Sequence, residues 1–145
     1  MASTSSISIP ESARRLFETD EPATIVTINA DGTPQVSMVW PELDQGEIVV
    51  AADNSYVKIR NLRRNPLVTI MINSRERTPK GLQHHLIVRG RASIEGPGIP
   101  DQYEALTTRL ARRYFPDGPP PRRGLADGVI VRITPERIRG IGPWA

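Results

Sequence analysis

The segment with the clearest chemical character runs from Lys58 to Pro66 and reads KIRNLRRNP; it follows the apolar run 48–52. A strand that leads into a helical turn presents backbone N–H groups to an anion, and basic side chains add positive charge. Residues 60, 63 and 64 share one helical face, whereas Lys58 does not. We therefore predict that Lys58 holds a phosphate at the helix start. The arginine face suits an anionic tail, a partner chain or solvent.

Composition excludes several other kinds of chemistry. The 145-residue chain has no cysteine, which excludes disulfides, Cys-ligated zinc and thiol catalysis. Its two histidines, His84 and His85, are adjacent and would point to opposite faces of a strand, so we predict no metal site. No apolar run approaches the roughly 20 residues of a membrane span, and the first residues do not resemble a secretory signal. We expect a cytoplasmic protein that does not bind membranes.

The formal charge of +3 is too small to indicate nucleic-acid binding by itself. Two Phe, two Trp and three Tyr provide few stacking platforms, and no recognition motif is present. The anion at the basic turn is therefore predicted to belong to a small molecule rather than to a nucleic acid.

Periodicity and turn residues predict the elements that position this turn. Strands are predicted at 23–28, 33–40, 47–52, 68–73, 86–94, 129–134 and 137–141, and helices at 11–18, 56–64 and 101–115. Ser8 begins a capping-box pattern, and Ser55 or Asn54 is expected to cap the basic helix. Residues 75–81 and 117–124 are predicted to be loops. Residues 1–7 are expected to be disordered.

Short connections between these strands favour antiparallel pairing, and closure into a small barrel would remove exposed edges. We find no internal repeat and no domain boundary. The chain is therefore predicted to be a single domain over 1–145.

The order of these motifs resembles a known family. A strand, an Asp-Gly turn and two further strands precede KIRNLRRNP; HHLIVRGRASI, YEALTTRLARRYF and VIVRITPERIRGIGPW follow. This order resembles the pyridoxamine 5'-phosphate oxidase-like split β-barrel superfamily, and most of all its F420 (deazaflavin)-dependent reductase B-type branch. The resemblance implies a mainly β, antiparallel, FMN-binding-protein-like split barrel with flanking helices. It also implies an obligate homodimer with the cofactor at the subunit interface.

The resemblance further implies a set of cofactor-binding positions on two strands, the basic helix and a later strand. They are Ser37, Met38, Val39, Trp40, Ala51, Ala52, Tyr56, Val57, Lys58, Asn61, Arg64 and His85. Three of them depart from the flavin-binding pattern: Tyr56 stands in place of a serine, Val57 of an arginine and His85 of a glutamine. These departures favour F420 over riboflavin phosphate (FMN). Trp144 is expected to pack against the dimer partner or the cofactor ring.

The resemblance implies an oxidoreductase that transfers a hydride between reduced F420 and a small unsaturated organic substrate. No catalytic acid is identified, so water or a pocket hydroxyl would supply the proton. Two alternatives remain open. One is an FMN-dependent oxidoreductase on the same fold, and the other is a carrier that binds F420 or another anionic ligand without turnover.

Overall fold

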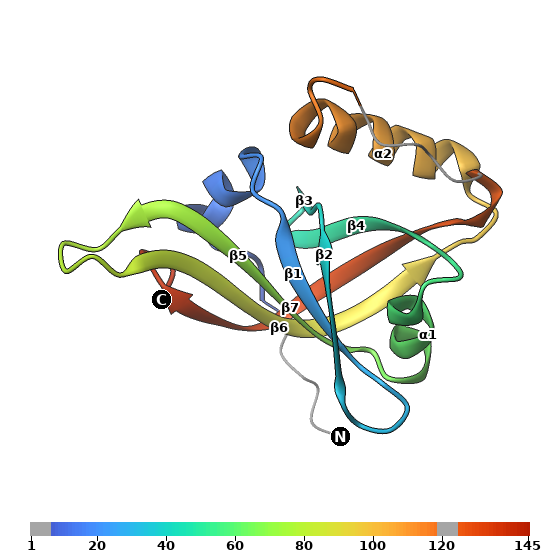
Figure 1. Ribbon diagram of the computed structural model, residues 1–145, viewed down its shortest axis with the longest axis horizontal. Helices are drawn as coiled ribbons and strands as arrows, with labels where there is room; N and C mark the ends of the chain where they lie inside the picture. The colour runs from blue at the N-terminus through green and yellow to red at the C-terminus, as the bar shows by residue number, and fades with distance from the viewer. Residues whose placement is uncertain (1–6, 119–124) are drawn as a thin grey trace.

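The computed structural model describes residues 7–118 and 125–145 (Figure 1). The predicted disorder of residues 1–6 and most of the predicted 117–124 loop lie outside the described residues. Ile7 is ordered, because its backbone N–H donates to the carbonyl of Pro135 at 2.9 Å. No helix in the described part of the chain is both long and apolar enough to cross a membrane.

The strands form one antiparallel seven-stranded sheet in the order β2-β1-β5-β6-β7-β4-β3. The strands are β1 (Ala23–Ile28), β2 (Pro34–Val39), β3 (Glu42–Asp44), β4 (Glu47–Asp53), β5 (Leu67–Arg77), β6 (Gln83–Glu95) and β7 (Gly128–Ile141). The helices are η1 (Glu11–Glu18), α1 (Val57–Arg64), α2 (Pro100–Tyr114) and η2 (Leu125–Asp127). The prediction of a mainly β fold with flanking helices is confirmed.

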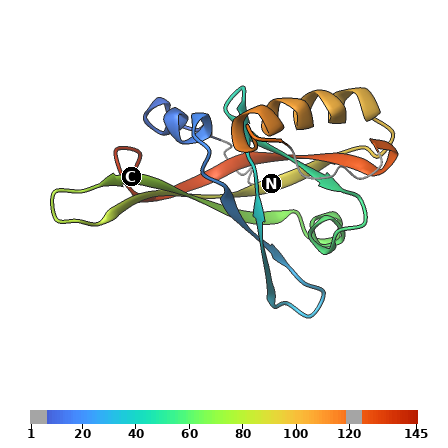
Figure 2. The same cartoon turned by 45° about the horizontal axis from the view of Figure 1, so that its top comes forward.

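Two apolar clusters hold the sheet and the helices together. In the larger one, inward residues of the strands pack against η1 and α1, to which Ala13, Leu16, Phe17, Ile59 and Leu62 belong. In the smaller one, Leu106, Leu110 and Tyr114 of α2 pack over Val49 and Ile130. Figure 2 shows α2 lying along the sheet. Because α2 covers only β4 and the start of β7, the outward face of β2, β1 and β5 stays exposed.

Three features of the strands differ from the prediction. The 75–81 loop is shorter than expected, because β5 continues to Arg77. The short strand β3, directly after Pro41, was not predicted. The two predicted C-terminal strands are one strand, β7, because pairing with β6 skips a single residue: Arg89 pairs with Arg137 and Gly90 with Pro135. The extra residue, Glu136, forms a β-bulge that absorbs the proline without ending the strand.

Neither predicted helix cap is present. The residue before η1 is Pro10 and the residue before α1 is Tyr56, and neither makes a side-chain capping bond. Asp53 shapes the approach to α1 instead, because its Oδ1 accepts from the N–H and the hydroxyl of Ser55, at 2.9 and 2.5 Å. This local Asx-turn orients the chain before the helix begins.

Trp144 makes contacts within its own chain, and its predicted contact with a dimer partner or the cofactor ring stays a prediction. Its Nε1 donates to the carbonyl of His85 at 2.9 Å, and its ring meets the ring of His84 edge-on at 6.0 Å. His84 and His85 point to opposite faces of β6, as the strand prediction required.

Candidate functional site

The start of α1 carries Lys58, the basic residue that the sequence predicted to hold a phosphate. The chain leaves β4 at the buried Asp53, turns through residues 54–56 and enters α1 at Val57. The first bonds of this turn are made by Ile59 and Arg60, whose N–H groups donate to the carbonyl of Tyr56. Among the described residues, no acceptor faces the N–H groups of Val57 and Lys58. These two donors point out of the helix start, where an anion is favoured.

Lys58 lies half-buried beside that helix start. Its Nζ is 3.2 Å from Oγ of Ser37 on β2 and 5.3 Å from the centre of the Tyr56 ring. No carboxylate among residues 7–118 and 125–145 lies within ion-pair distance of this ammonium group. The structure thus brings together Ser37, Tyr56 and Lys58, although Ser37 precedes Lys58 by 21 residues in the sequence.

Burial lowers the pKa of Lys58 from its usual 10.5. The cause is desolvation, which disfavours the charged form when no opposite charge compensates it. A half-buried ammonium group without an acidic partner is a ready binding site for an anion, because an arriving phosphate or carboxylate would restore the missing compensation.

Trp40 and Ala51 form an apolar flank under the end of α2. The Trp40 ring packs on Phe115 with ring centres 5.3 Å apart, and 37% of the residue remains exposed. Ala51 belongs to the cluster beneath α2 together with Phe115. Phe115 was not among the predicted site residues, and only its position at the end of an amphipathic helix hinted at it.

Four predicted site residues pack in the core or hold α1 against β1. Val39 and Ala52 are buried in the main core, so only their backbone is available to a ligand. Asn61 is 3% exposed, and its Nδ2 donates to Thr27 Oγ1 and Asn29 Oδ1 at 3.0 and 2.9 Å. Arg64 donates to Asn61 Oδ1 and to the carbonyl of Ile28. Asn61 and Arg64 therefore tie α1 to β1.

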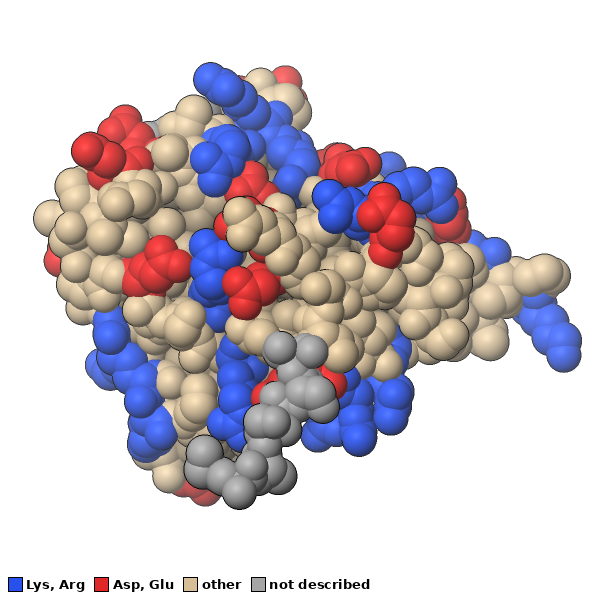
Figure 3. Space-filling model, turned by 180° about the vertical axis from the view of Figure 1, so that it is seen from behind, with Lys and Arg blue, Asp and Glu red and all other residues tan. Residues whose placement is uncertain are grey.

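The basic face of α1 is less free than its sequence indicates. Arg63 donates to Oδ1 of Asn54 at 2.7 Å, and Arg64 is engaged as described. Arg60 is exposed with no recorded partner among the described residues. Figure 3 shows that basic side chains gather toward the lower part of one face of the molecule, whereas the upper part mixes both signs of charge.

Of the remaining predicted positions, two adjoin this group in the chain and one lies apart from it. Met38 follows Ser37 and Val57 precedes Lys58, and both residues are exposed, at 57% and 44%. His85 pairs with Asn73 far along β5, six residues beyond the strand start that adjoins α1. At a rise of about 3.3 Å per residue, this places His85 roughly 20 Å along the sheet from α1. Within one chain, His85 does not join the Lys58 site.

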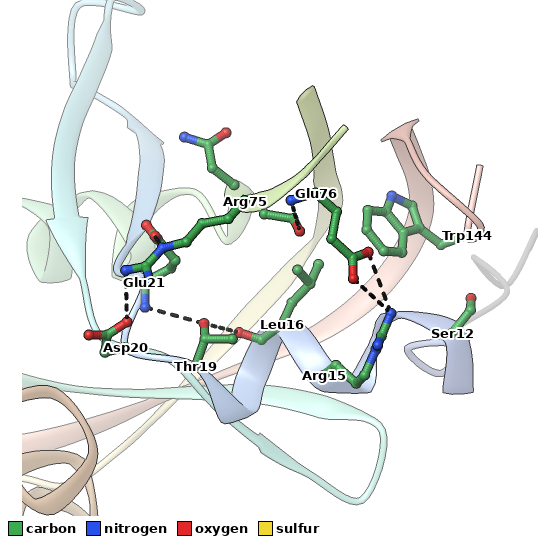
Figure 4. Close-up of a pocket in the computed structure, with 11 residues that line it drawn as sticks. Ser12, Arg15, Leu16, Thr19, Asp20, Glu21, Arg75, Glu76 and Trp144 are labelled. Atoms are coloured by element: carbon green, nitrogen blue, oxygen red, sulfur yellow. Dashed lines mark hydrogen bonds and ion pairs between the residues drawn. The ribbon is translucent and has the colours of Figure 1, made fainter. Parts of the chain in front are cut away.

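A separate cleft of about 250 Å³ lies between η1 and β5 (Figure 4). Its apolar floor contains Leu16 and Trp144. Its charged side chains are paired with one another: Arg15 with Glu76, and Arg75 with Asp20 and Glu21. In the described part of the chain, no cluster of three or more metal-ligating side chains is present. The cleft therefore offers no unpaired charge to a ligand, and we place the candidate site at Lys58.

The seven-stranded antiparallel sheet with its flanking helices is a split β-barrel, as the comparisons with known proteins show. A family model for pyridoxamine 5'-phosphate oxidase matches residues 9–142. The chain belongs to this family, which confirms the resemblance read from the sequence.

Solved structures agree with this membership. The chain is 30% identical to an F420 reductase, with a TM-score of 0.71 over 90% of this chain and 98% of that one. It lies in the branch of this reductase. A putative pyridoxamine 5'-phosphate oxidase from Listeria innocua shares the fold at 20% identity, with a TM-score of 0.66 over 88% of this chain and 93% of the other.

A conserved hypothetical protein from Mycobacterium tuberculosis also shares the fold, at 22% identity and a TM-score of 0.66 over 96% of this chain and 89% of the other. No protein of curated function matches the chain. The family and the F420 reductase together support an oxidoreductase-like function of the flavin or deazaflavin type.

Proposed function

We propose that this protein is an F420-dependent oxidoreductase that transfers a hydride between reduced F420 and a small unsaturated organic molecule. The observation that carries the proposal is the half-buried Lys58 ammonium at the start of α1, which has no acidic partner among the described residues and lies beside Ser37. The similarity to an F420 reductase supports the choice of cofactor.

The residues at this site fit the phosphorylated arm of such a cofactor. Lys58 supplies a charge, Ser37 a hydroxyl, and Val57 and Lys58 two outward backbone N–H groups. These are the donors that a phosphodiester requires. The flank of Trp40 and Phe115 offers an aromatic surface close to the end of β2. When bound, the deazaflavin ring would supply the hydride chemistry.

The protein would contribute binding, orientation and the exclusion of water. Lys58 would fix the phosphate end, so that the ring lies against the aromatic flank rather than in solvent. We assign no acid to the proton that accompanies hydride transfer. Water or a hydroxyl of the site would deliver it.

We further propose that the protein acts as a homodimer with the cofactor between the subunits. Val36 and Met38 of β2 are 59% and 57% exposed on the outward face that α2 leaves uncovered. Exposed apolar surface of this kind favours association. A second copy would also explain His85, which within one chain lies far from Lys58 and would reach the cofactor from the partner subunit.

Equilibrium binding of F420 and of FMN tests the cofactor. We expect F420 to bind at micromolar concentrations or tighter, and FMN to bind more weakly. Replacement of Lys58 by glutamine should weaken F420 binding by about 10- to 100-fold, the value of a lost charge-assisted hydrogen bond. The matched control is Lys80→Gln, at an exposed position of the β5–β6 turn, which should leave affinity unchanged.

Turnover separates the enzyme from its alternatives. Oxidation of reduced F420 by a panel of unsaturated acceptors, followed through the absorbance of the cofactor, should be catalysed by the wild-type protein. Tight F420 binding without turnover across the panel would indicate a carrier. Preferential FMN binding, visible as a yellow protein on purification, would indicate a flavin enzyme instead.

A further inference from the structure

Two arginines face each other directly on the neighbouring strands β6 and β7. Arg89 of β6 is in register with Arg137 of β7, and both are exposed. Directly opposed side chains on antiparallel strands have Cβ atoms about 5 Å apart, and like charges at this separation destabilise the pair. The repulsion between the two arginines therefore lowers the stability of the sheet unless an anion lies between them.

Carboxylates of the described chain do not neutralise the pair. Glu136, the bulge residue of β7 next to Arg137, is paired with Arg91, whose Nε is 3.3 Å from Glu136 Oε2. No ion pair is recorded for Arg89 or Arg137 with any residue in 7–118 or 125–145. Arg139, two residues further along β7, donates only to the carbonyl of Ile138. The group therefore carries uncompensated positive charge.

The arginine pair borders a cleft of about 390 Å³. The apolar part of its lining comes from β1 and the start of β5, namely Val26, Ile28, Leu67 and Val68. A cleft of this volume is large enough for a small molecule. It thus combines an apolar floor with the two guanidinium groups. Glu136 also lines the cleft, and its carboxylate is paired with Arg91.

The β-bulge of β7 builds this cleft. Gly90 also lines it, and a Cβ at this position would lie 2.2 Å from the carbonyl oxygen of Thr134. The absence of a side chain at Gly90 therefore lets β7 approach β6 closely at the point where Glu136 forms the bulge. The bulge then turns Arg137 to the same side as Arg89.

This cleft is distinct from the Lys58 site. Ser37, which contacts Lys58, is in register with the buried Ile25 and so lies on the inward side of the sheet. Val26 and Ile28 alternate with Ile25 and Thr27 and therefore lie on the outward side. A ligand in the cleft would not compete with one at Lys58.

We propose that this cleft is a second binding site, for a small organic oxyanion: a carboxylate or monophosphate attached to an apolar, aromatic or branched body. The two guanidinium groups would share the oxyanion through paired N–H donors. The apolar body would cover the floor formed by Val26, Ile28 and Leu67. The inference does not depend on the identity of the cofactor.

Titration calorimetry with phenyl phosphate, benzoate and inorganic phosphate tests the site. The titrations use the full chain carrying Lys58→Gln, so that binding at the cofactor site does not contribute. We expect one phenyl phosphate or benzoate per chain. Inorganic phosphate should bind at least about fivefold more weakly than phenyl phosphate, because it buries no apolar surface. Arg89→Gln and Arg137→Gln should each weaken binding of phenyl phosphate by about tenfold or more.

Arg112→Gln, at an exposed position of α2, is the matched control and should bind like its parent. Circular dichroism and the subunit mass are recorded for every variant. Absence of saturable binding, or equal binding by all variants, would overturn the proposal. So would dissociation of a dimer by Arg89→Gln without any probe binding, which would show that a second copy of the chain covers the cleft.

Discussion

Burial makes the charge of Lys58 sensitive to pH. Its pKa lies below the usual 10.5 because the ammonium group is partly desolvated. Below that lowered pKa the group is charged and binds an anion. As pH rises through it, the charge and the affinity are lost. Affinity for F420 should therefore begin to fall at a lower pH than it would if Lys58 had the pKa of an ordinary lysine.

A series of affinities measured between neutral and alkaline pH checks this expectation. Lys58→Arg remains charged throughout, so its affinity should stay flat over the same range. Parallel pH curves for the wild type and this variant would contradict the assignment of the titrating group to Lys58.

The same pKa shift has the opposite sign for stability. A lysine whose folded-state pKa is lowered binds its proton less tightly than in the unfolded chain, so it destabilises the fold while charged. The free energy of unfolding of the ligand-free protein should therefore rise as pH increases through the lowered pKa of Lys58. Lys58→Met, compared by urea denaturation at several pH values, should lack this increase.

At the scale of elements, Asn61 fastens α1 to β1. Replacement by alanine removes both donors from Thr27 and Asn29 and the acceptor from Arg64. Because these groups are partly or fully buried, we expect the free energy of unfolding to fall by about 1–3 kcal/mol. Urea denaturation measures the change. Arg60→Gln, on the exposed side of the same helix, should change stability by less than about 0.5 kcal/mol.

Gly90 determines whether the bulge of β7 can form. In Gly90→Ala, the new Cβ would have to displace the Thr134 carbonyl, so we expect a loss of about 1–3 kcal/mol in the free energy of unfolding. Thermal and urea denaturation are compared with Ser93→Ala, an exposed change on the same strand. An unchanged midpoint in Gly90→Ala would show that β7 moves away without cost.

The sequence predicted where most strands lie, but not that its last two predicted strands form one continuous strand, β7. A run of β-branched and apolar residues placed β1 correctly from Ala23 to Ile28, and the Asp-Gly turn at Gly32 placed β2. Pro135 misled the prediction, because a proline usually ends a strand, whereas here a residue of the partner strand, Gly90, makes room for a bulge. Such compensation depends on pairing between distant segments and is not visible locally.

The site shows the same limit. Lys58 could be singled out because its charge and its position at a helix start are local properties. The structural roles of Asn61 and Arg64 could not be foreseen, because their partners Thr27, Asn29 and Ile28 lie more than 30 residues earlier. Arg89 and Arg137 were read as ordinary strand residues, since only the sheet register places them face to face.

At the scale of the whole molecule, the exposed apolar residues of edge strand β2 predict the assembly. Met38→Glu would place a charge on this strand and should shift the protein from dimer to monomer, as measured by analytical ultracentrifugation. Ala105→Glu, at an exposed position of α2, should leave the mass unchanged. A monomeric wild-type protein would contradict the proposed arrangement, because His85 could then not contact the cofactor.

The strand order also has a consequence for how the chain is made. β3 and β4 emerge early during synthesis, yet β4 joins the rest of the sheet only through β7, the last strand of the chain. Until Gly128–Ile141 leave the ribosome, no strand pairing joins the early β3-β4 hairpin to the β2-β1-β5-β6 part of the sheet. The sheet should therefore be completed only after β7 has left the ribosome, and nascent chains that stop short of β7 should be cut readily by proteases.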